Sequence, residues 1–425
     1  MRSSIRSRRG RGILYRGNDG LSVQGGINYV VILILALPTL FTGPALGNTI
    51  LAAGTAGEPG IDVDARAVGM GGAALALFEG TNVNGTNPAA PASYGRAVFN
   101  VTLYRGYNSY DTREGRSVEI TYDVPRAELA VPISEAAAFS AVFSQELNQN
   151  YELTRPLEYE GKPVGVSRLK GVGSVYSFSA GIASRFGGRW LGGVSAGYDF
   201  GAPREIYSKE FKAKGYSRIE EDFEAAYKGV KGALGAGFLI SDRLSLGAAA
   251  EIYGDHRVHE TVSTEYATLY EEDHRFKMPW SAGLGAAYVV GPRGRFAADV
   301  RSTSWSRFAV DGRKFGYRNT VEFHAGAEGR LTTGAKSFFL WRMPYRLGVS
   351  YAPWYSMEHG DFAKAGVAAG AGYLFSNNEN SRLDFALEYS RRGDRASQGL
   401  GEQMLDFYLS VVGLEAWLGK RGRED

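Results

Sequence analysis

The sequence predicts an all-β protein, a transmembrane antiparallel β-barrel of about 14 strands with a small N-terminal plug. Alternation of apolar and polar residues with a period of two recurs along the chain, whereas no apolar run after residue 48 reaches the length of a membrane-spanning helix. Short turns and long polar connections alternate between these segments. The 425 residues include 57 glycines and 25 tyrosines. Helical bundles do not tolerate so much glycine, because each interior glycine costs about 1 kcal/mol relative to alanine.

Residues 1–47 are expected to be a signal peptide. Six arginines and a single acidic residue come first, then an apolar run at 29–41 broken by Pro38, then the small residues Ala45 and Gly47 before the cleavage point. This run is shorter than the ~20 residues that span a bilayer. Without the segment, the formal net charge falls from +3 to about −2, which argues against a nucleic-acid partner. The absence of cysteine is compatible with export.

Residues 48–95 are expected to form a periplasmic segment and an N-terminal hatch, or plug. Small residues let the backbone approach inward-facing side chains closely, and glycine permits tight turns. A chain that precedes the first strand starts in the periplasm and can fold back into a bore that would otherwise leak. Asn87 and Pro88 fit a helix cap and a first helical position, and Pro91 is expected to stop that helix early. The expected hatch and gating residues are Gly69, Gly71, Gly72, Asn87, Pro88 and Ala89.

The barrel is expected over residues 96–419, followed by a polar tail at 420–425. In the segment RLSLGAAAEIY, Leu246 and Ile252 share one face, while Gly247 and Glu251 share the other. Segments of this kind predict strands at 97–106, 117–133, 136–147, 172–184, 190–200, 230–240, 243–254, 281–290, 295–304, 320–331, 345–353, 365–376, 382–391 and 405–418.

The connections between these strands predict which end of the barrel faces outward. The turns ISEAA, FGGR, SDR, GPRG and SNNENS are short, with 332–344 as the exception on that side, whereas 148–171, 201–229 and 255–280 are long and polar. This sidedness is typical of outer-membrane barrels, which have short periplasmic turns and long outer loops. The run 217–229 is expected to be a solvated outer extension that can include a short helix. Closure is required, because an unpaired backbone group in hydrocarbon costs several kcal/mol.

The six tryptophans fall at the expected strand ends. Trp190, Trp341 and Trp417 lie at periplasmic ends, and Trp280, Trp305 and Trp354 lie at outer ends, as expected for aromatic girdles at the two lipid–water interfaces. A soluble β-sandwich or propeller would also alternate. It would not need long connections confined to alternate positions, and no repeat of propeller-blade length is evident.

Charged residues on the faces opposite the apolar ones are expected to line the lumen, because a charge facing lipid at the midplane costs about 2–4 kcal/mol. The expected lumen-facing residues are Glu251, Asp299, Arg301, Glu322, His324, Glu328, Asp384 and Glu388.

Three motifs that resemble catalytic or ligand sites are interpreted as structural. The GVSAG run around Ser195 fits the G-x-S-x-G nucleophile elbow, but that elbow needs a strand, a turn and a helix, whereas these residues lie inside an alternating strand. In GRLTTGAKS, Ala335 interrupts the phosphate-loop pattern. His256, His259 and Glu260 have the spacing of a metal site but are interpreted as solvated loop residues. No enzyme activity, cofactor or metal is therefore expected.

The run ARAVGMGGA at residues 65–73, followed by the Asn-Pro-Ala motif at 87–89, resembles the start of the FadL-type outer-membrane transporters of long-chain fatty acids and other hydrophobic compounds. The resemblance implies a fourteen-stranded barrel with an N-terminal hatch, and a hydrophobic ligand first captured by the outer loops 201–229 and 255–280. A similar glycine-rich opening occurs in related barrels, including some associated with protein secretion.

The same resemblance implies that ligand leaves sideways through a kink in the third strand. Here the third predicted strand, 136–147, contains no glycine or proline that would kink it. Pro125 and Pro132 lie in the preceding strand instead, where a proline can force a bulge.

The expected function is passive uptake of hydrophobic small molecules such as long-chain fatty acids, through an outer-membrane channel or transporter gated by the plug. The expected location is the outer membrane of a Gram-negative-type bacterium, and the expected partners are a hydrophobic ligand and outer-membrane lipid. The alternative is a non-transport outer-membrane barrel that acts as a structural or protein-secretion-associated component, with secretion or assembly partners. A carrier should contain an apolar pocket between plug and wall, whereas a scaffold should have a filled or wet lumen.

Overall fold

A computed structural model describes residues 49–60, 63–78, 84–112, 115–212, 218–332, 334, 337–358, 360–375 and 381–415. The expected signal peptide at 1–47, the expected tail at 420–425 and Trp417 lie outside these residues. Among the described residues, no helix is long and apolar enough to cross a membrane.

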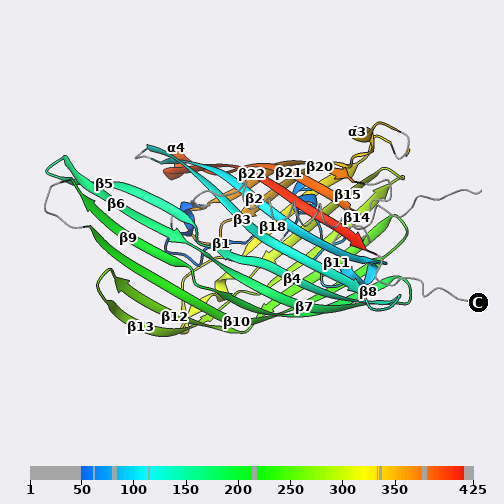
Figure 1. Ribbon diagram of the computed structural model, residues 1–425, viewed down its shortest axis with the longest axis horizontal. Coiled ribbons are helices and arrows are strands. Elements are labelled where there is room, and N and C mark those ends of the chain that lie inside the picture. Colours follow the sequence, from blue (N-terminus) through cyan, green and yellow to red (C-terminus); the bar gives the residue numbers. More distant parts are fainter. Residues whose placement is uncertain are drawn as a thin grey trace, which may run out of the picture. The chain divides into compact units, whose positions relative to one another are not determined.

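Fourteen antiparallel strands form a closed wall, which confirms the predicted fold class and strand number (Figure 1). Each wall strand pairs with the next, and the last pairs with the first, from Ala97↔Glu415 to Thr112↔Leu400. The wall strands are β2 (Ala97–Thr112), β3 (Gly115–Pro132), β4 (Ala137–Asn148), β7 (Ser174–Phe186), β8 (Trp190–Gly201), β10 (Ile219–Leu239), β11 (Leu244–Tyr253), β14 (Ser281–Val290), β15 (Gly294–Thr303), β18 (Thr320–Gly329), β19 (Tyr345–Pro353), β20 (Ala363–Leu374), β21 (Ser381–Asp394) and β22 (Leu400–Glu415).

Further strands continue the sheet beyond the outer end of the wall, at the left of Figure 1. They occupy the segments expected as long outer loops, together with the connection after β15. The expectation of a short helix within 217–229 is wrong, because β10 already begins at Ile219. Its first residues pair with β9 on one side and β12 on the other, so two ladders satisfy their backbone groups. The added strands are β5 (Tyr151–Tyr159), β6 (Lys162–Val172), β9 (Arg204–Phe211), β12 (Asp255–Thr264), β13 (Thr268–Lys277), β16 (Ala309–Val310) and β17 (Arg313–Lys314).

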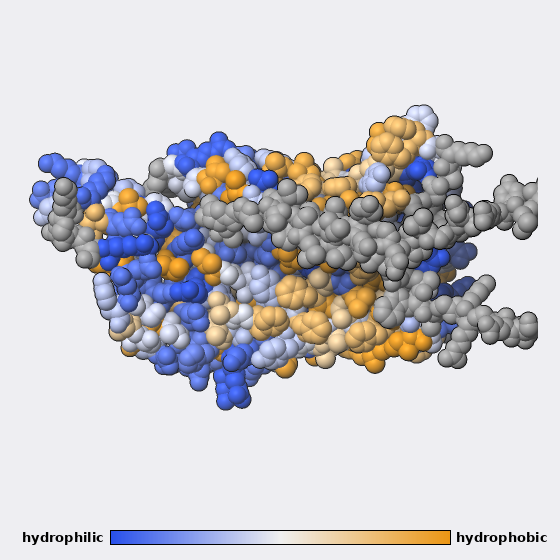
Figure 2. All heavy atoms as spheres, in the orientation of Figure 1, coloured by the Kyte–Doolittle hydropathy of each residue, from blue (hydrophilic) through white to orange (hydrophobic). Residues whose placement is uncertain are grey.

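The outward face of the wall is apolar. Figure 2 shows hydrophobic residues gathered over the right-hand part of the molecule and hydrophilic residues over the extended outer strands at the left. Ile182 on β7, Leu284 on β14 and Leu347 on β19 are all more than half exposed on this face. Exposed apolar side chains in a continuous band are what a lipid-facing wall requires.

The girdle interpretation holds for only some of the tryptophans. Trp190 and Trp341 at the periplasmic end, and Trp280 at the outer end, are exposed. Trp305 and Trp354 do lie at outer strand ends, but each is only 5% exposed and packs inside the barrel, so their assignment to the girdle is wrong. Each follows the end of a wall strand, where the chain turns over the bore and carries the indole inward.

The segment before β2 contains short elements: η1 (Ile50–Ala52), β1 (Glu58–Pro59), α2 (Ala65–Gly69) and η2 (Ala90–Ser93). α2 begins where the Asp64 carboxylate accepts the Ala67 N–H. Pro91 was expected to stop a helix, but it lies in the first turn of η2. A proline fits there because that position has no N–H partner to lose. The other helices are η3 (Trp305–Arg307), α3 (Phe339–Arg342) and α4 (Arg395–Gln398).

Two register breaks interrupt the wall. Thr102 pairs with Arg126 and Tyr104 with Asp123, so a bulge occurs at Pro125, where the sequence allowed one. A second break lies in β4 between Gln145 and Leu147, in a strand without glycine or proline. On the other edge of β4, where its pairing with β3 ends at Ser144, β1 pairs with the outer end of the strand and Gly60 N–H donates to the Glu146 carbonyl (2.8 Å).

Candidate functional site: the bore and the segment inside it

Residues 63–78 and 84–95, here called the hatch, pack against the inner face of the wall. Asp299 on β15 accepts the backbone N–H groups of Ala74 (2.7 Å) and Leu75 (2.9 Å) through one carboxylate oxygen. His324 on β18 donates from Nδ1 to the Gly71 carbonyl (2.7 Å). These wall side chains hold a turn of the hatch by its backbone rather than by its side chains.

The expected glycines of the hatch lie where the backbone touches the wall. Gly71 and Gly72 have positive φ angles of 70° and 90°, a conformation that glycine adopts without strain. A Cβ added at Gly71 would overlap the Val349 backbone, and one at Gly72 would press on the His324 ring. Gly69 lies against Arg346 and Gly370.

Asn87 connects two parts of the hatch to the wall. Its Nδ2 donates to the Leu75 carbonyl (2.8 Å) and to the Ala236 carbonyl of β10 (3.1 Å), while its Oδ1 accepts the Ala89 N–H (3.0 Å). Asn87 and Ala89 are fully buried. The Pro88 carbonyl lies against Gly193 of β8.

Glycines on the wall opposite the hatch were missed by the sequence reasoning. A Cβ added to any of them would overlap hatch atoms, such as the Leu75 carbonyl at Gly247 or the Gly71 nitrogen at Gly348. These glycines occupy inward-facing positions of their strands. The sequence does not show where the hatch touches the wall, so they could not be distinguished from other small residues of the barrel. The glycines concerned are Gly193, Gly235, Gly247, Gly326 and Gly348.

A buried ion-pair cluster fills the periplasmic half of the bore. The Glu328 carboxylate forms ion pairs with Arg66 of the hatch, Arg346 and Arg295, with N···O distances of 2.9, 2.6 and 3.3 Å. The Asp384 carboxylate forms ion pairs with Arg346 and Arg382, each with an N···O distance of 2.7 Å. The Arg346 side chain is fully buried. This cluster, called the arginine layer below, joins the hatch to β18, β19 and β21.

The other expected lumen residues also lie on inner faces. Arg301 and Glu322 are direct partners across β15 and β18, and both line the cavities described below. Glu251 on β11 lies 3.9 Å from Lys231 Nζ. Glu388 on β21 lies 3.4 Å from Lys364 Nζ.

Residues 49–60, here called the N-terminal arm, lie at the outer end of the bore. Arg392 near the outer end of β21 contacts Glu58 (2.6 Å) and Glu402 (3.2 Å), and its guanidinium lies 4.8 Å from the Trp354 ring centre. Thr49 Oγ1 donates to Glu402 (2.7 Å). The arm is therefore held by side chains that no sequence motif pointed to.

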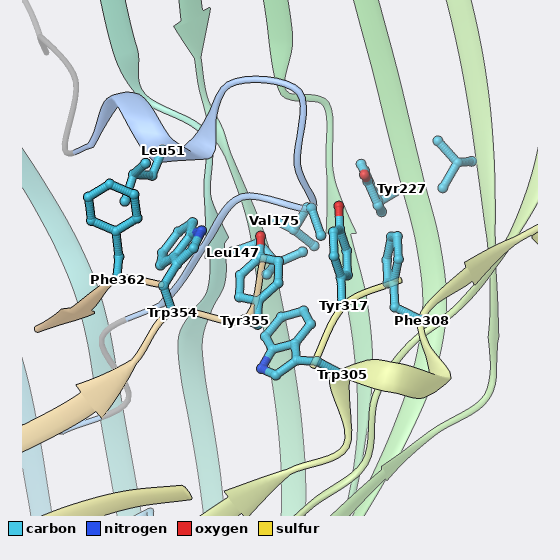
Figure 3. Close-up of a cluster of buried hydrophobic side chains, with 12 residues drawn as sticks. Leu51, Leu147, Val175, Tyr227, Trp305, Phe308, Tyr317, Trp354, Tyr355 and Phe362 are labelled. Atoms are coloured by element: carbon cyan, nitrogen blue, oxygen red, sulfur yellow. The ribbon is translucent and has the colours of Figure 1, made fainter. Parts of the chain in front are cut away.

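An aromatic cluster covers the bore beside this arm (Figure 3). Trp305 and Tyr355 stack with ring centres 3.9 Å apart, and Trp354 stacks on Tyr355 at 4.7 Å. Leu51 of the arm belongs to the same cluster, next to Phe362 in Figure 3.

Below the aromatic cluster a cavity of about 210 Å³ lies between the hatch, the arm and the wall. It is called the outer chamber below. Its walls combine rings, including Trp354, Tyr104 and Tyr408, with charged groups, including Lys364 and Asp406. A second cavity of about 180 Å³ adjoins β11 and β14 and includes Glu251.

Two of the three motifs interpreted as structural lie among the described residues, whereas Thr333, Ala335 and Lys336 of the run GRLTTGAKS lie outside them. Ser195 lies within β8, and its neighbour Gly193 faces the hatch. His256 lies in β12, points inward to Asp199 (2.7 Å) and is fully buried, so its interpretation as a solvated loop residue is wrong. His259 is exposed beside Asp273 (2.8 Å). Residues three apart on a strand lie on opposite faces, so these two imidazoles do not converge on one metal ion.

Comparison with solved structures identifies the fold. A FadL homologue from Pseudomonas aeruginosa matches 84% of this chain over 99% of its own, with 14% identity and a TM-score of 0.58. The toluene transporter TbuX of Ralstonia pickettii covers 83% and 98% (16% identity, TM-score 0.57), and the toluene transporter TodX of P. putida covers 85% and 99% (15% identity, TM-score 0.56). The resemblance to FadL-type barrels is thus confirmed for the fold.

The barrel fold and its apolar outer face place the chain in the outer membrane of a Gram-negative-type bacterium. The structures it resembles are transporters and channels rather than enzymes. A search of curated proteins finds no match to the chain. A protein-family model, BamG, matches residues 57–422, almost the whole described chain, and the protein accordingly belongs to the BamG family.

Proposed function

We propose that this protein is a passive outer-membrane channel for small hydrophobic molecules, and that the hatch gates its bore. The observation that carries the proposal is the outer chamber, a cavity lined by hatch, arm and wall directly beneath a buried aromatic cluster. Ligand sites are typically concave, aromatic-lined and furnished with a few polar groups. The solved structures with this fold include toluene transporters and a monoaromatic hydrocarbon channel, which supports the same class of ligand.

The size of the chamber bears on the ligand. About 210 Å³ is less than the pockets of roughly 300–1,000 Å³ that hold drug-sized ligands, but more than the cavity of about 150 Å³ that accepts benzene. The proposed ligand therefore has the size of one substituted ring. Uptake of long-chain fatty acids stays a prediction, and the chamber favours the smaller compounds. The chamber also differs from the apolar pocket expected of a carrier, because charged side chains share its walls with the rings.

An engineered disulfide tests whether the hatch must move. The Ala65 nitrogen lies 2.9 Å from Ser410 Oγ on β22, so the test pairs Ala65→Cys with Ser410→Cys, and the native chain has no cysteine that would compete. We expect toluene flux into proteoliposomes to stop when the pair is oxidised and to return on reduction, while each single cysteine variant stays active. Flux that is unaffected by the closed disulfide would contradict gating. Palmitate flux, measured alongside, tests the fatty-acid prediction.

A non-transport barrel is the second candidate, and the fixation of the hatch favours it. Moving the hatch would separate Arg66 from Glu328 and the Ala74 and Leu75 N–H groups from Asp299. Breaking buried charged contacts of this kind costs several kcal/mol. A barrel closed permanently in this way would serve as a structural component. Proteoliposomes that contain the wild-type protein, or the double-cysteine variant in its oxidised or reduced form, would then show no toluene flux.

A further inference from the structure

Charge in the outer chamber is unbalanced. Lys364 is shared by two carboxylates, Glu388 at 3.4 Å and Asp406 at 3.9 Å, which face each other directly across β21 and β22. Arg392 is likewise shared by Glu58 and Glu402. On the chamber wall, Lys364 and Arg392 thus stand against the three carboxylates of Glu58, Glu388 and Asp406, and Glu402 lies outside the chamber on the other side of Arg392. Like charges directly opposite each other on neighbouring strands destabilise a sheet, so this arrangement leaves a demand for positive charge.

The remaining charged groups of the chamber wall do not meet that demand. Arg301 and Glu322 face each other across β15 and β18, which leaves their sum neutral. His324 uses its Nδ1 to donate to the Gly71 carbonyl. Its Nε2 has no hydrogen-bond partner among the described residues and lies 3.6 Å from the Glu322 carboxylate.

Aromatic faces complete the chamber. Tyr104 and Tyr408 lie with ring centres 5.2 Å apart, and the Tyr104 hydroxyl donates to Asp406 (2.9 Å). Trp354 already holds the Arg392 guanidinium over its ring, which shows that a cation is stable against this wall. Rings beside excess carboxylates are the combination that recognises organic cations.

The arginine layer has the opposite excess. Four arginines, Arg66, Arg295, Arg346 and Arg382, surround the two carboxylates Glu328 and Asp384. The chamber wall thus carries more carboxylates than cations, whereas the arginine layer carries more cations than carboxylates. A cation entering from outside meets attraction first and repulsion below.

We propose that the outer chamber is a binding site for a small organic cation, an amine attached to one aromatic ring, which rests there above the arginine layer. This inference rests on the proposed function and narrows its ligand class. The ammonium group lies beside Glu388 and Asp406, where it supplies the missing charge, and the ring packs among Tyr104, Tyr408 and Trp354. Displacement of the hatch, which carries Arg66 away from the layer, lowers the barrier to further passage.

Three probes of nearly equal size test the charge preference by isothermal titration calorimetry on the detergent-solubilised full chain. They are 2-phenylethylammonium, the neutral 2-phenylethanol and the anion phenylacetate. We expect the cation to bind at least about tenfold more tightly than either of the others, as for a cation held in a desolvated aromatic site. Glu388→Gln should reduce this preference to within about threefold, because the carboxylate excess is smaller. Lys364→Gln should increase it, because the excess is larger.

Glu272→Gln is the matched control, since it removes a carboxylate from the exposed face of β13 outside the chamber. Heat-modifiable electrophoretic mobility confirms that each variant is folded, and the opposite effects expected for Glu388→Gln and Lys364→Gln cannot both arise from misfolding. Equal binding of the cation and the alcohol, with no effect of either substitution, overturns this inference while the proposed channel stands. Preferential binding of phenylacetate also overturns it. Binding of none of the three probes contradicts the inference and the proposed function together.

Discussion

At the scale of single residues, the bore depends on close backbone contact and on buried charge. Gly71 combines a positive φ of 70° with a position in which a side chain would overlap the Val349 backbone. Glu328 gathers three arginines from two wall strands and the hatch. The first residue allows the hatch to seat, and the second holds it there, so their substitution should have different consequences.

Gly71→Ala should prevent the hatch from seating fully. A left-handed backbone costs a non-glycine residue about 1–2 kcal/mol, and the overlap with Val349 adds to this. We expect increased ion conductance in planar bilayers from a barrel that still folds. Gly95→Ala is the control, because a Cβ there meets nothing within 4 Å. Equal conductance of the two variants would show that the contact at Gly71 does not seal the bore.

Glu328→Gln should destabilise the barrel strongly. Removing one partner of a buried ion pair costs about 3–5 kcal/mol, because Arg66 and Arg346 are left without their counter-charge. The free energy of unfolding in a urea titration of the vesicle-inserted protein should fall accordingly. Glu271→Gln, at an exposed ion pair 3.9 Å from His259, should leave it nearly unchanged. An equal decrease in the free energy of unfolding for both variants would show that the buried cluster stabilises the barrel no more than an exposed ion pair does.

At the scale of elements, the outer strands show how polar side chains reinforce a short ladder beside the aromatic cluster, to which Phe276 of β13 and Val310 of β16 contribute. β13 pairs with β12 over most of its length but with β16 at only two residues. A side-chain contact reinforces this weaker junction: His274 Nδ1 lies 2.7 Å from Asp311, and Nε2 lies 3.3 Å from Glu260. The register break between β4 and β7 lies in the stretch where β1 replaces β3 along the other edge of β4.

The junction between β13 and β16 should weaken as the pH rises. The hydrogen bond to Asp311, together with the charges of Asp311, Glu260 and Glu272, raises the pKa of His274 above its usual 6.5. A raised pKa in the folded state gives stabilisation that is complete below the unfolded pKa and is lost as the pH rises through the folded value. Amide-exchange protection of residues 268–277 should therefore fall above about pH 6.5.

The same pair sets the behaviour in acid. The Arg275 N–H and His274 hold the pKa of Asp311 below its usual 3.8, so its contribution is lost only as the pH falls through that lowered value. Protection should thus be greatest between these two limits. His274→Gln should remove the change above neutrality, and a wild-type profile that is flat across this range would contradict the role of the pair.

At the scale of the whole molecule, the protein is a lipid-exposed cylinder filled by its own N-terminal residues. The distribution of side chains is the reverse of that in a soluble globular protein, because apolar side chains face outward and charged ones face the bore. The hatch converts that wet interior into packed contacts, and the outer chamber is what remains between them. A charge placed on the outer face should be costly where that face contacts lipid and tolerated where it contacts solvent.

Leu284→Arg should impair insertion into bilayers. Leu284 lies in the middle of β14 and is 69% exposed on the outward face, where a midplane arginine costs about 2–4 kcal/mol. Leu269→Arg is the control, since Leu269 is 58% exposed but lies on β13, among the outer strands. Folding yield into lipid vesicles should fall for the first variant alone. Equal yields would place the face of β14 outside the lipid.

The sequence alone was sufficient for the wall: alternation with a period of two and the unequal lengths of the connections predicted fourteen strands and their direction. These are local signals, because each residue's face follows from its place in the strand. The contacts of the hatch could not be predicted in this way. Gly348 meets Gly71, Glu328 meets Arg66 and Arg392 meets Glu58 only once the cylinder has closed and the N-terminal residues lie inside it. Trp305 and Trp354 turn inward for the same reason, because the path of the chain over the bore, and not the position of a residue in a strand, decides which side of the barrel it faces.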